Sequence, residues 1–173
     1  MKTIIRKLVS DACKFKNYEM INFPNQDNVL LLLRDDYHLF YNLEKFNLQI
    51  SISIEDEWVD YLMFPSPRMI NSQNKIELIK LINYVNWFVS AFGHFYIDIY
   101  GDIAYKVRLP KYFIMEYTEK AGQEFFDVPI NFFRTIQTPL IMISDGMWDS
   151  DIAIKFTGEL FSKGYVNNED YNI

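Results

Sequence analysis

Cysteine, histidine and glycine are all scarce in this chain of 173 residues. Cys13 is the only cysteine, which excludes an internal disulfide framework and suits a reducing compartment. The two histidines, His38 and His94, have no spacing that would build a zinc site with one cysteine. The six glycines are scattered, so no phosphate-binding loop is present. We therefore expect neither a metal nor a cofactor.

Long apolar runs are also missing. The uninterrupted run at 29–33 is far too short to span a bilayer, and polar residues break the apolar stretch at 81–92. The segment after the first lysines is too short and too polar for the apolar region of a signal peptide. These features predict a soluble, cytoplasmic protein that has no membrane partner.

Basic residues are outnumbered. Seventeen lysines and arginines stand against 23 acidic residues, which gives a net charge of −6 and an isoelectric point near 4.9. Such a chain should repel phosphate backbones, so we expect no nucleic-acid partner. The basic residues are scattered except for a weak cluster near the start, at Lys2, Arg6, Lys7, Lys14 and Lys16. A solvated helix face explains that cluster better than an acidic partner does.

Large hydrophobic side chains are abundant. Hydrophobic residues make up 50% of the chain and aromatic residues 17%, and the length suits one domain over residues 1–173. The aromatic rings can fill a core and a sheet, since strands favour them. They can also form a contact surface, since Tyr and Trp are enriched at interfaces. We favour the first interpretation and keep the second open.

Alternating patterns predict strands in the first two thirds of the chain. Residues 48–54 alternate apolar and polar side chains, and residues 58–64 read as the returning strand that Pro65-Ser66-Pro67 stops. A hairpin follows at 94–109, with Gly101-Asp102 able to make its turn. Residues 29–43 fit either a buried strand and turn or a leucine-rich helical turn. A short helix is predicted before all of these, at 4–15.

The strongest helix pattern covers residues 74–92. Asn74 is a plausible N-cap with Glu77 in a capping-box position, and Gly93 sits where a C-cap belongs. Its polar residues form one narrow stripe, at Glu77, Lys80, Asn83, Asn86 and Ser90. Because a helix on a surface normally shows a wider polar face, this one should be covered by its sheet on one side and by more helix or a second subunit on another. Asn83 and Asn86 are expected to hydrogen-bond a neighbouring loop or strand edge.

The C-terminal third reads as helical. Residues 125–143 are rich in apolar side chains, with Pro129 as a helix start and Pro139 as a kink or break. Asp145-Gly146 should interrupt the helix, and 151–161 could form the last one. The polar tail from 166 onward is expected to fray.

Three segments in the middle of the chain carry a family resemblance. They are Leu-Ile-Asn-Tyr-Val-Asn at 81–86, Phe-Tyr-Ile-Asp-Ile-Tyr-Gly-Asp-Ile at 95–103, and Leu109-Pro110. In these segments the chain resembles the YbjN-like, type III secretion chaperone-like group. The resemblance implies an α+β fold in which a long central helix packs on an antiparallel sheet between N- and C-terminal helices. It also implies a protein that has no catalytic site, is often dimeric and binds other proteins.

Several residue sets could carry chemistry, and each has a structural explanation. Cys13 would need His38 or His94 beside it to act as a nucleophile. His94, Tyr96, Asp98 and Tyr100 share one strand face, where an acid–base pair or ligand site is conceivable; cross-strand pairing of Asp98 with Lys106 or Arg108 is preferred.

The C-terminal acidic residues Asp145, Asp149 and Asp151 could hold a divalent cation, but their spacing does not match a calcium loop. A helix N-cap at Asp149 or Asp151 is preferred.

The sequence thus predicts a non-enzymatic protein-interaction domain with a chaperone- or adaptor-like role, in a homodimer or with a protein partner. Recognition would use edge-strand addition or an amphipathic segment in a groove. The candidate partner-binding residues are aromatic: Tyr84, Trp87, Phe88, Tyr96 and Tyr100. One alternative is an immunity or antitoxin-type protein that neutralises a basic toxin. Another is a small hydrolase or ligand binder built on His94 and Asp98.

Overall fold

An antiparallel sheet of six strands forms the centre of the structure, with the strand order β1-β2-β3-β4-β6-β5. The computed structural model describes residues 1–20, 36–66, 74–89, 91–97 and 103–163. The strands are β1 Glu19–Met20, β2 Asp36–Asn42, β3 Asn47–Ile54, β4 Trp58–Ser66, β5 His94–Ile97 and β6 Ile103–Pro110. The predicted strands at 48–54 and 58–64 and the two strands of the predicted hairpin are therefore confirmed.

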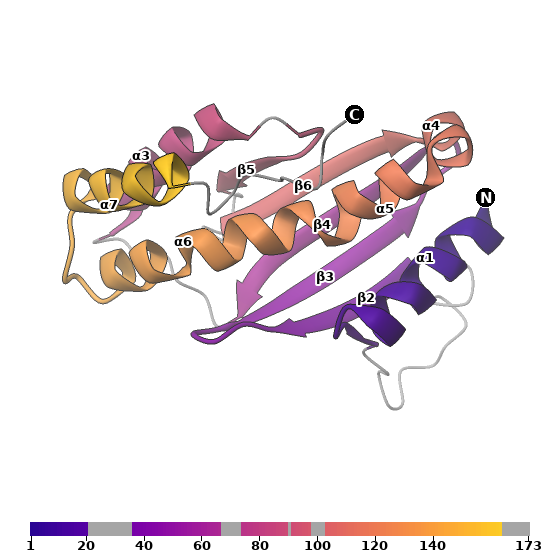
Figure 1. Cartoon of the computed structure of the whole chain (residues 1–173), viewed down its shortest axis with the longest axis horizontal. Coiled ribbons are helices and arrows are strands. Elements are labelled where there is room, and N and C mark those ends of the chain that lie inside the picture. Colours follow the sequence, from indigo (N-terminus) through magenta and orange to yellow (C-terminus); the bar gives the residue numbers. More distant parts are fainter. Residues whose placement is uncertain (21–35, 67–73, 90, 98–102, 164–173) are drawn as a thin grey trace.

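Helices precede, interrupt and follow the strands. They are α1 Lys2–Phe15, α3 Lys75–Phe88, α4 Lys111–Glu116, α5 Thr118–Phe126, α6 Val128–Ser144 and α7 Ser150–Ser162. Figure 1 shows α1, α5 and α6 lying across one face of the sheet, α3 beside α7 at one end, and α4 at the opposite end. The α+β class is confirmed, but the long helical segment on the sheet is α5 with α6, not residues 74–92.

The strands sort their side chains by face, as a period of two requires. In β3 the pairing Ile50↔Met63 and Ile52↔Tyr61 places large apolar side chains on the inner face, where they are fully buried beneath the helices. Polar side chains such as Gln49 occupy the outer face. The segment at 29–43 is resolved in part: residues 36–42 are strand β2, and residues 29–35 lie outside the described residues.

Aromatic rings fill much of the core between the inner face and α5–α6. Tyr61 stacks on Phe125 with ring centroids 5.5 Å apart, and Phe95 meets Phe133 edge-on at 5.1 Å. Such ring pairs add about 0.5–1.5 kcal/mol each to the free energy gained by burying their area. The core therefore accounts for many of the aromatic residues, in line with the favoured interpretation.

Two of the prolines predicted to interrupt a strand or a helix, Pro65 and Pro139, do not end the element that contains them. Pro65 pairs with Leu48 inside β4, so the strand continues to Ser66. This is possible because β4 pairs with β6 only as far as Met63, so the missing N–H of Pro65 removes no bond on that side. Pro129 begins α6 as predicted, whereas Pro139 lies buried inside that helix without ending it.

The helix at α3 is shorter than predicted. It ends at Phe88 because Val89 adopts an extended backbone conformation, four residues before Gly93. Gly93 serves a different purpose: a Cβ atom there would lie 2.4 Å from the ring of the fully buried Tyr105. The interruption predicted at Asp145-Gly146 is confirmed, with Gly146 at a φ of 70°. The predicted turn at 101–102 and the tail lie outside the described residues.

Candidate protein-docking surface

The helices α3 and α7 pack side by side and run parallel. Glu77 accepts a hydrogen bond from the backbone N–H of Ser150 at 2.8 Å, and the ring of Phe88 lies 4.7 Å from that of Phe161. Between these two contacts, a Cβ atom at Gly158 would lie 2.5 Å from the Tyr84 hydroxyl oxygen. The absence of that atom lets the two helices approach closely. The predicted cover for α3 is thus supplied on one side by α7 (Figure 1).

The opposite side of α3 is attached to the sheet by Asn86. The Asn86 side chain donates to the backbone oxygen of Phe95 and accepts from its backbone N–H, both at 2.8 Å. Because N–H and C=O of one strand residue point to the same side, these bonds occupy the edge of β5 that faces away from β6. The predicted role of Asn86 in holding a strand edge is confirmed, while Asn83 is exposed.

This contact bears on edge-strand addition, one of the two predicted recognition modes. A partner strand would need the outward-facing N–H and C=O of β5. At Phe95 both groups are already bound by Asn86. The outer edge of β5 is therefore blocked at Phe95, so a partner strand cannot pair with β5 along its whole length.

The predicted cap at the start of α3 is wrong in detail. Asn74 occupies the N-cap position, but its side chain makes no cap hydrogen bond and instead donates to the backbone oxygen of Ser144 at 3.4 Å. Glu77 does not close a capping box, because it binds Lys80 and the first residue of α7. Both side chains thus join α3 to the neighbouring α6 and α7. These contacts fix α3 in place.

The outward side of α3 carries large apolar side chains in solvent. Trp87 is 87% exposed and Ile76 is 67% exposed, with Ile79 also exposed. Lys80 and Asn83 lie between them, at helical spacings of three and four. These five residues, which we name the α3 stripe, form the candidate docking surface. Its apolar members, Ile76, Ile79 and Trp87, are the hydrophobic side chains of α3 that α6, α7 and β5 leave uncovered.

The four predicted partner-binding residues that the structure describes do not lie on one surface. Trp87 belongs to the α3 stripe. Phe88 is 40% exposed but packs on Phe161, and Tyr84 is half-buried against Phe88 and α7. Tyr96 is half-buried on β5, where the ring of His94 is 6.1 Å away. Tyr100 lies outside the described residues.

The polar sets considered for catalysis do not assemble in the described residues. Cys13 packs against the core on the helix-covered side, and burial raises the pKa of its thiol, which disfavours the nucleophilic thiolate. His38 and His94 alternate with the buried Leu39 and Phe95, so they face the outer side of the sheet. Asp98 lies outside the described residues.

Arg108 has a different partner from the predicted Asp98. It makes two hydrogen bonds to the Asp60 carboxylate, at 2.7 and 2.6 Å, across the β4–β6 pair. The guanidinium holds the pKa of Asp60 below its ordinary value. Arg108 is thus paired across the β4–β6 strands, and the predicted pairing of Asp98 stays a prediction because Asp98 lies outside the described residues.

The acidic C-terminal residues serve as a helix cap. The Asp149 carboxylate accepts from the backbone N–H of Ile152 at 2.9 Å, which confirms the predicted N-cap of α7. Among the residues that the structure describes, no group of three or more His, Cys, Asp or Glu side chains could hold a metal ion.

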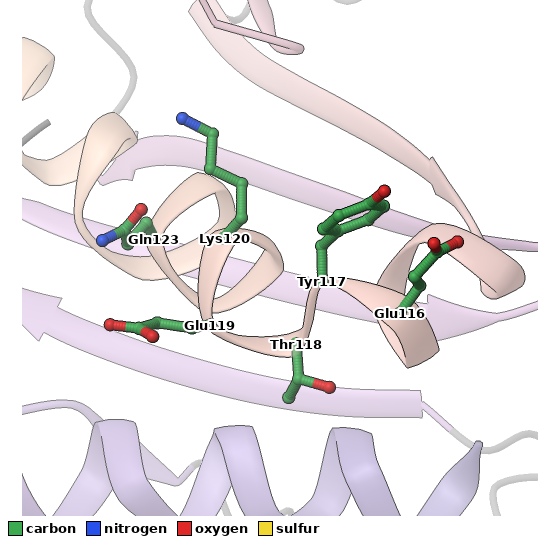
Figure 2. Close-up of a pocket in the computed structure, with 6 residues that line it drawn as sticks. All are labelled: Glu116, Tyr117, Thr118, Glu119, Lys120 and Gln123. Carbon is green, nitrogen blue, oxygen red and sulfur yellow. The ribbon is translucent and has the colours of Figure 1, made fainter. Parts of the chain in front are cut away.

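A hollow of about 400 Å³ lies beside the junction of α4 and α5. Glu116, Tyr117, Lys120 and Gln123 are among its lining residues. Figure 2 shows that these side chains do not converge: Tyr117 and Glu116 point away from α1, Thr118 points toward it, and Glu119 points sideways. The hollow is a surface depression and lacks the convergent polar groups of a catalytic site.

The exposed apolar residues of this region were not predicted from the sequence. Tyr112 is 66% exposed, and Met115 and Tyr117 are each about half exposed. A short helix of six residues gives too little periodicity for its outward side to be read from sequence. The only available signal was the run of Tyr and Met between charged residues.

Comparison with known proteins adds no relative. No protein-family model, curated protein or solved structure matches the chain. The resemblance to secretion chaperone-like proteins therefore stays a prediction. In the described part of the chain, no helix combines the length and apolar character needed to cross a bilayer.

Proposed function

We propose that this protein is a non-enzymatic interaction domain with an adaptor- or chaperone-like role, and that it assembles with a second copy of itself through the α3 stripe. The observation that carries the proposal is the 87% exposure of Trp87 on a helix whose other side is firmly held. Leaving a Trp and two Ile side chains in water forgoes the free energy of their burial, about 1.5–3 kcal/mol for each fully buried side chain. A covering protein surface recovers it.

The α3 stripe suits a symmetric contact. Ile76 and Ile79 lie near one end of α3 and Trp87 near the other, about 16 Å from Ile76 and about 12 Å from Ile79 at 1.5 Å per residue. In an antiparallel pairing about a two-fold axis, Trp87 of each copy meets the isoleucines of its partner. Asn83 and Lys80 then lie near the axis, where the stripe carries a single charge per copy.

Light scattering combined with size-exclusion chromatography tests this proposal on the full chain. A monomer has a mass of 20.7 kDa. We expect a dimer whose population rises with concentration, and we expect Trp87→Ser to shift it to the monomer. Trp87 fluorescence, taken as the difference between the wild type and Trp87→Phe, should move to shorter wavelength as the dimer forms.

Lys14→Ser is the control, because it changes an exposed polar residue of α1, outside the α3 stripe. It should leave the mass of the dimer unchanged. A wild-type chain that stays monomeric at high concentration, with its Trp87 emission unshifted, would contradict assembly through the α3 stripe.

Neutralisation of a basic protein toxin is a second candidate function. The net charge of −6 favours it, because opposite charge steers association and makes it depend on ionic strength. Its distinguishing result would be tight binding of one basic protein that weakens steeply with salt.

A further inference from the structure

The end of the molecule around α4 combines exposed apolar and acidic side chains. Tyr112, Met115 and Tyr117 supply the apolar part, each with at least half of its surface in water. The acidic part comes from Glu116 and from the β3–β4 turn at Glu55, Asp56 and Glu57, all exposed. We name these seven residues the α4 end surface.

Backbone contacts hold the two parts together. The N–H of Lys111, the first residue of α4, donates to the backbone oxygen of Glu57 at 2.9 Å. One residue away, Trp58 pairs with Pro110, so β6 ends and α4 begins directly beside the acidic turn. The acidic turn and the apolar helix therefore form one surface although they lie more than fifty positions apart in the sequence.

The basic side chains near this end are engaged elsewhere or partly buried. Arg108 is bound by the Asp60 carboxylate, Lys120 lies 3.9 Å from Glu124, and Lys111 is half-buried. Helix α1, which carries further basic residues, lies on the side of α5 from which Glu116 and Tyr117 point away (Figure 2).

We infer that the α4 end surface binds a basic amphipathic segment of a partner protein, whose lysines or arginines meet the carboxylates while its apolar side chains cover Tyr112, Met115 and Tyr117. The partner class follows from charge complementarity, because four exposed carboxylates at one place repel an acidic segment and attract a basic one. Met and Tyr suit such contacts, since both are enriched at interfaces and Met adapts to varied apolar shapes. An anionic membrane or a nucleic acid would be repelled by the same carboxylates.

This inference rests on the proposed interaction role but not on the α3 stripe, which lies at the opposite end of the sheet (Figure 1). The α4 end surface would hold the bound partner, and the α3 stripe would join two copies. The two contacts can be removed separately, so failure of one leaves the other measurable.

Fluorescence anisotropy with a defined probe tests the inference. The probe is a labelled amphipathic helix of leucine and lysine, about 18 residues long, and its counterpart carries glutamate in place of lysine. We expect the full chain to bind the lysine peptide and not the glutamate peptide. Binding should weaken as salt rises from about 50 to about 300 mM, because the attraction is screened.

Two independent variants locate the binding site. Tyr112→Ser with Met115→Ser removes the apolar contact, and Asp56→Lys with Glu116→Lys reverses two charges; each should weaken binding at least about tenfold. Asp151→Lys with Glu159→Lys makes the same change of net charge on exposed positions of α7 and should leave binding nearly unchanged. Trp87→Ser should leave peptide affinity unchanged even where it abolishes the dimer.

Three results would overturn the inference. One is a wild-type chain that does not bind the lysine peptide. Another is equal loss of binding in the α4 and α7 charge-reversal variants, which would mean that net charge alone attracts the peptide. The third is unchanged affinity in the Tyr112→Ser, Met115→Ser variant, with circular dichroism showing that all variants are folded.

Discussion

Single polar side chains decide how the edges and ends of this fold are joined. Asn86 binds both polar backbone groups of Phe95, and Glu77 binds the backbone at the start of α7. Neither contact lies within one helix or one sheet. Each therefore fixes a relation between elements that apolar packing alone would leave free to slide.

Replacing Asn86 measures this effect. We expect Asn86→Ala to lower the free energy of unfolding by about 1–2 kcal/mol, since two partly buried hydrogen bonds are worth about 1 kcal/mol each and alanine returns a few tenths in helix propensity. Urea denaturation gives the value. The matched change Asn83→Ala on the same helix should be neutral or slightly stabilising. Equal effects of the two changes would mean that the Asn86 contacts add nothing to stability.

At the scale of elements, α3 and α7 behave as one unit. They are parallel, they touch along their length, and Asp149 caps the start of α7. Their closeness depends on Gly158, which faces Tyr84. A glycine inside a helix normally costs about 1 kcal/mol relative to alanine, so its presence here is explained by the contact rather than by the helix.

A double change separates the two contributions of Gly158. In the wild type, Gly158→Ala should be destabilising, because its Cβ would lie 2.5 Å from the Tyr84 hydroxyl oxygen and overpacking costs about 1–3 kcal/mol. With Tyr84→Phe the nearest ring atom is 3.7 Å away, and the same change should stabilise α7 by up to about 1 kcal/mol. Thermal unfolding of the four proteins gives the coupling. Additive effects would refute a direct clash.

Over the whole molecule, a buried carboxylate couples the helices to the sheet. Glu124 of α5 is buried, and one of its oxygens accepts from the backbone N–H of Phe92 at 3.2 Å, just before β5. Burial raises the pKa of Glu124, against the smaller opposing effects of that hydrogen bond and of Lys120. The folded state therefore holds this proton to a higher pH than the unfolded chain does.

The sign of the pH effect follows from that difference. Between the unfolded and folded pKa values the folded state binds more protons, so the contribution of Glu124 to stability falls as pH rises through this window. We expect Glu124→Gln to melt at a higher temperature than the wild type at pH 7, with the difference vanishing near pH 4. The exposed Glu119→Gln on the same helix is the control. A lower melting temperature for Glu124→Gln at pH 7 would show that its two polar contacts outweigh burial.

The sequence by itself determined the elements with strong local patterns. Alternation located β3, β4 and the two hairpin strands, and the Asp149 cap and Pro129 marked helix starts, because these signals act within a few residues. It also indicated that the helix at 74–92 had too many apolar faces for one layer to cover. Helix α4 is too short for its exposed side to be predicted from the periodicity of the sequence.

Tertiary structure decided which surfaces those elements share. Only the folded chain places α5 and α6 on the sheet, gives Arg108 the partner Asp60, and brings the acidic β3–β4 turn beside α4. These relations join residues far apart along the chain, so no local pattern encodes them. The same holds for the α3 stripe, which is defined by what α6, α7 and β5 leave uncovered.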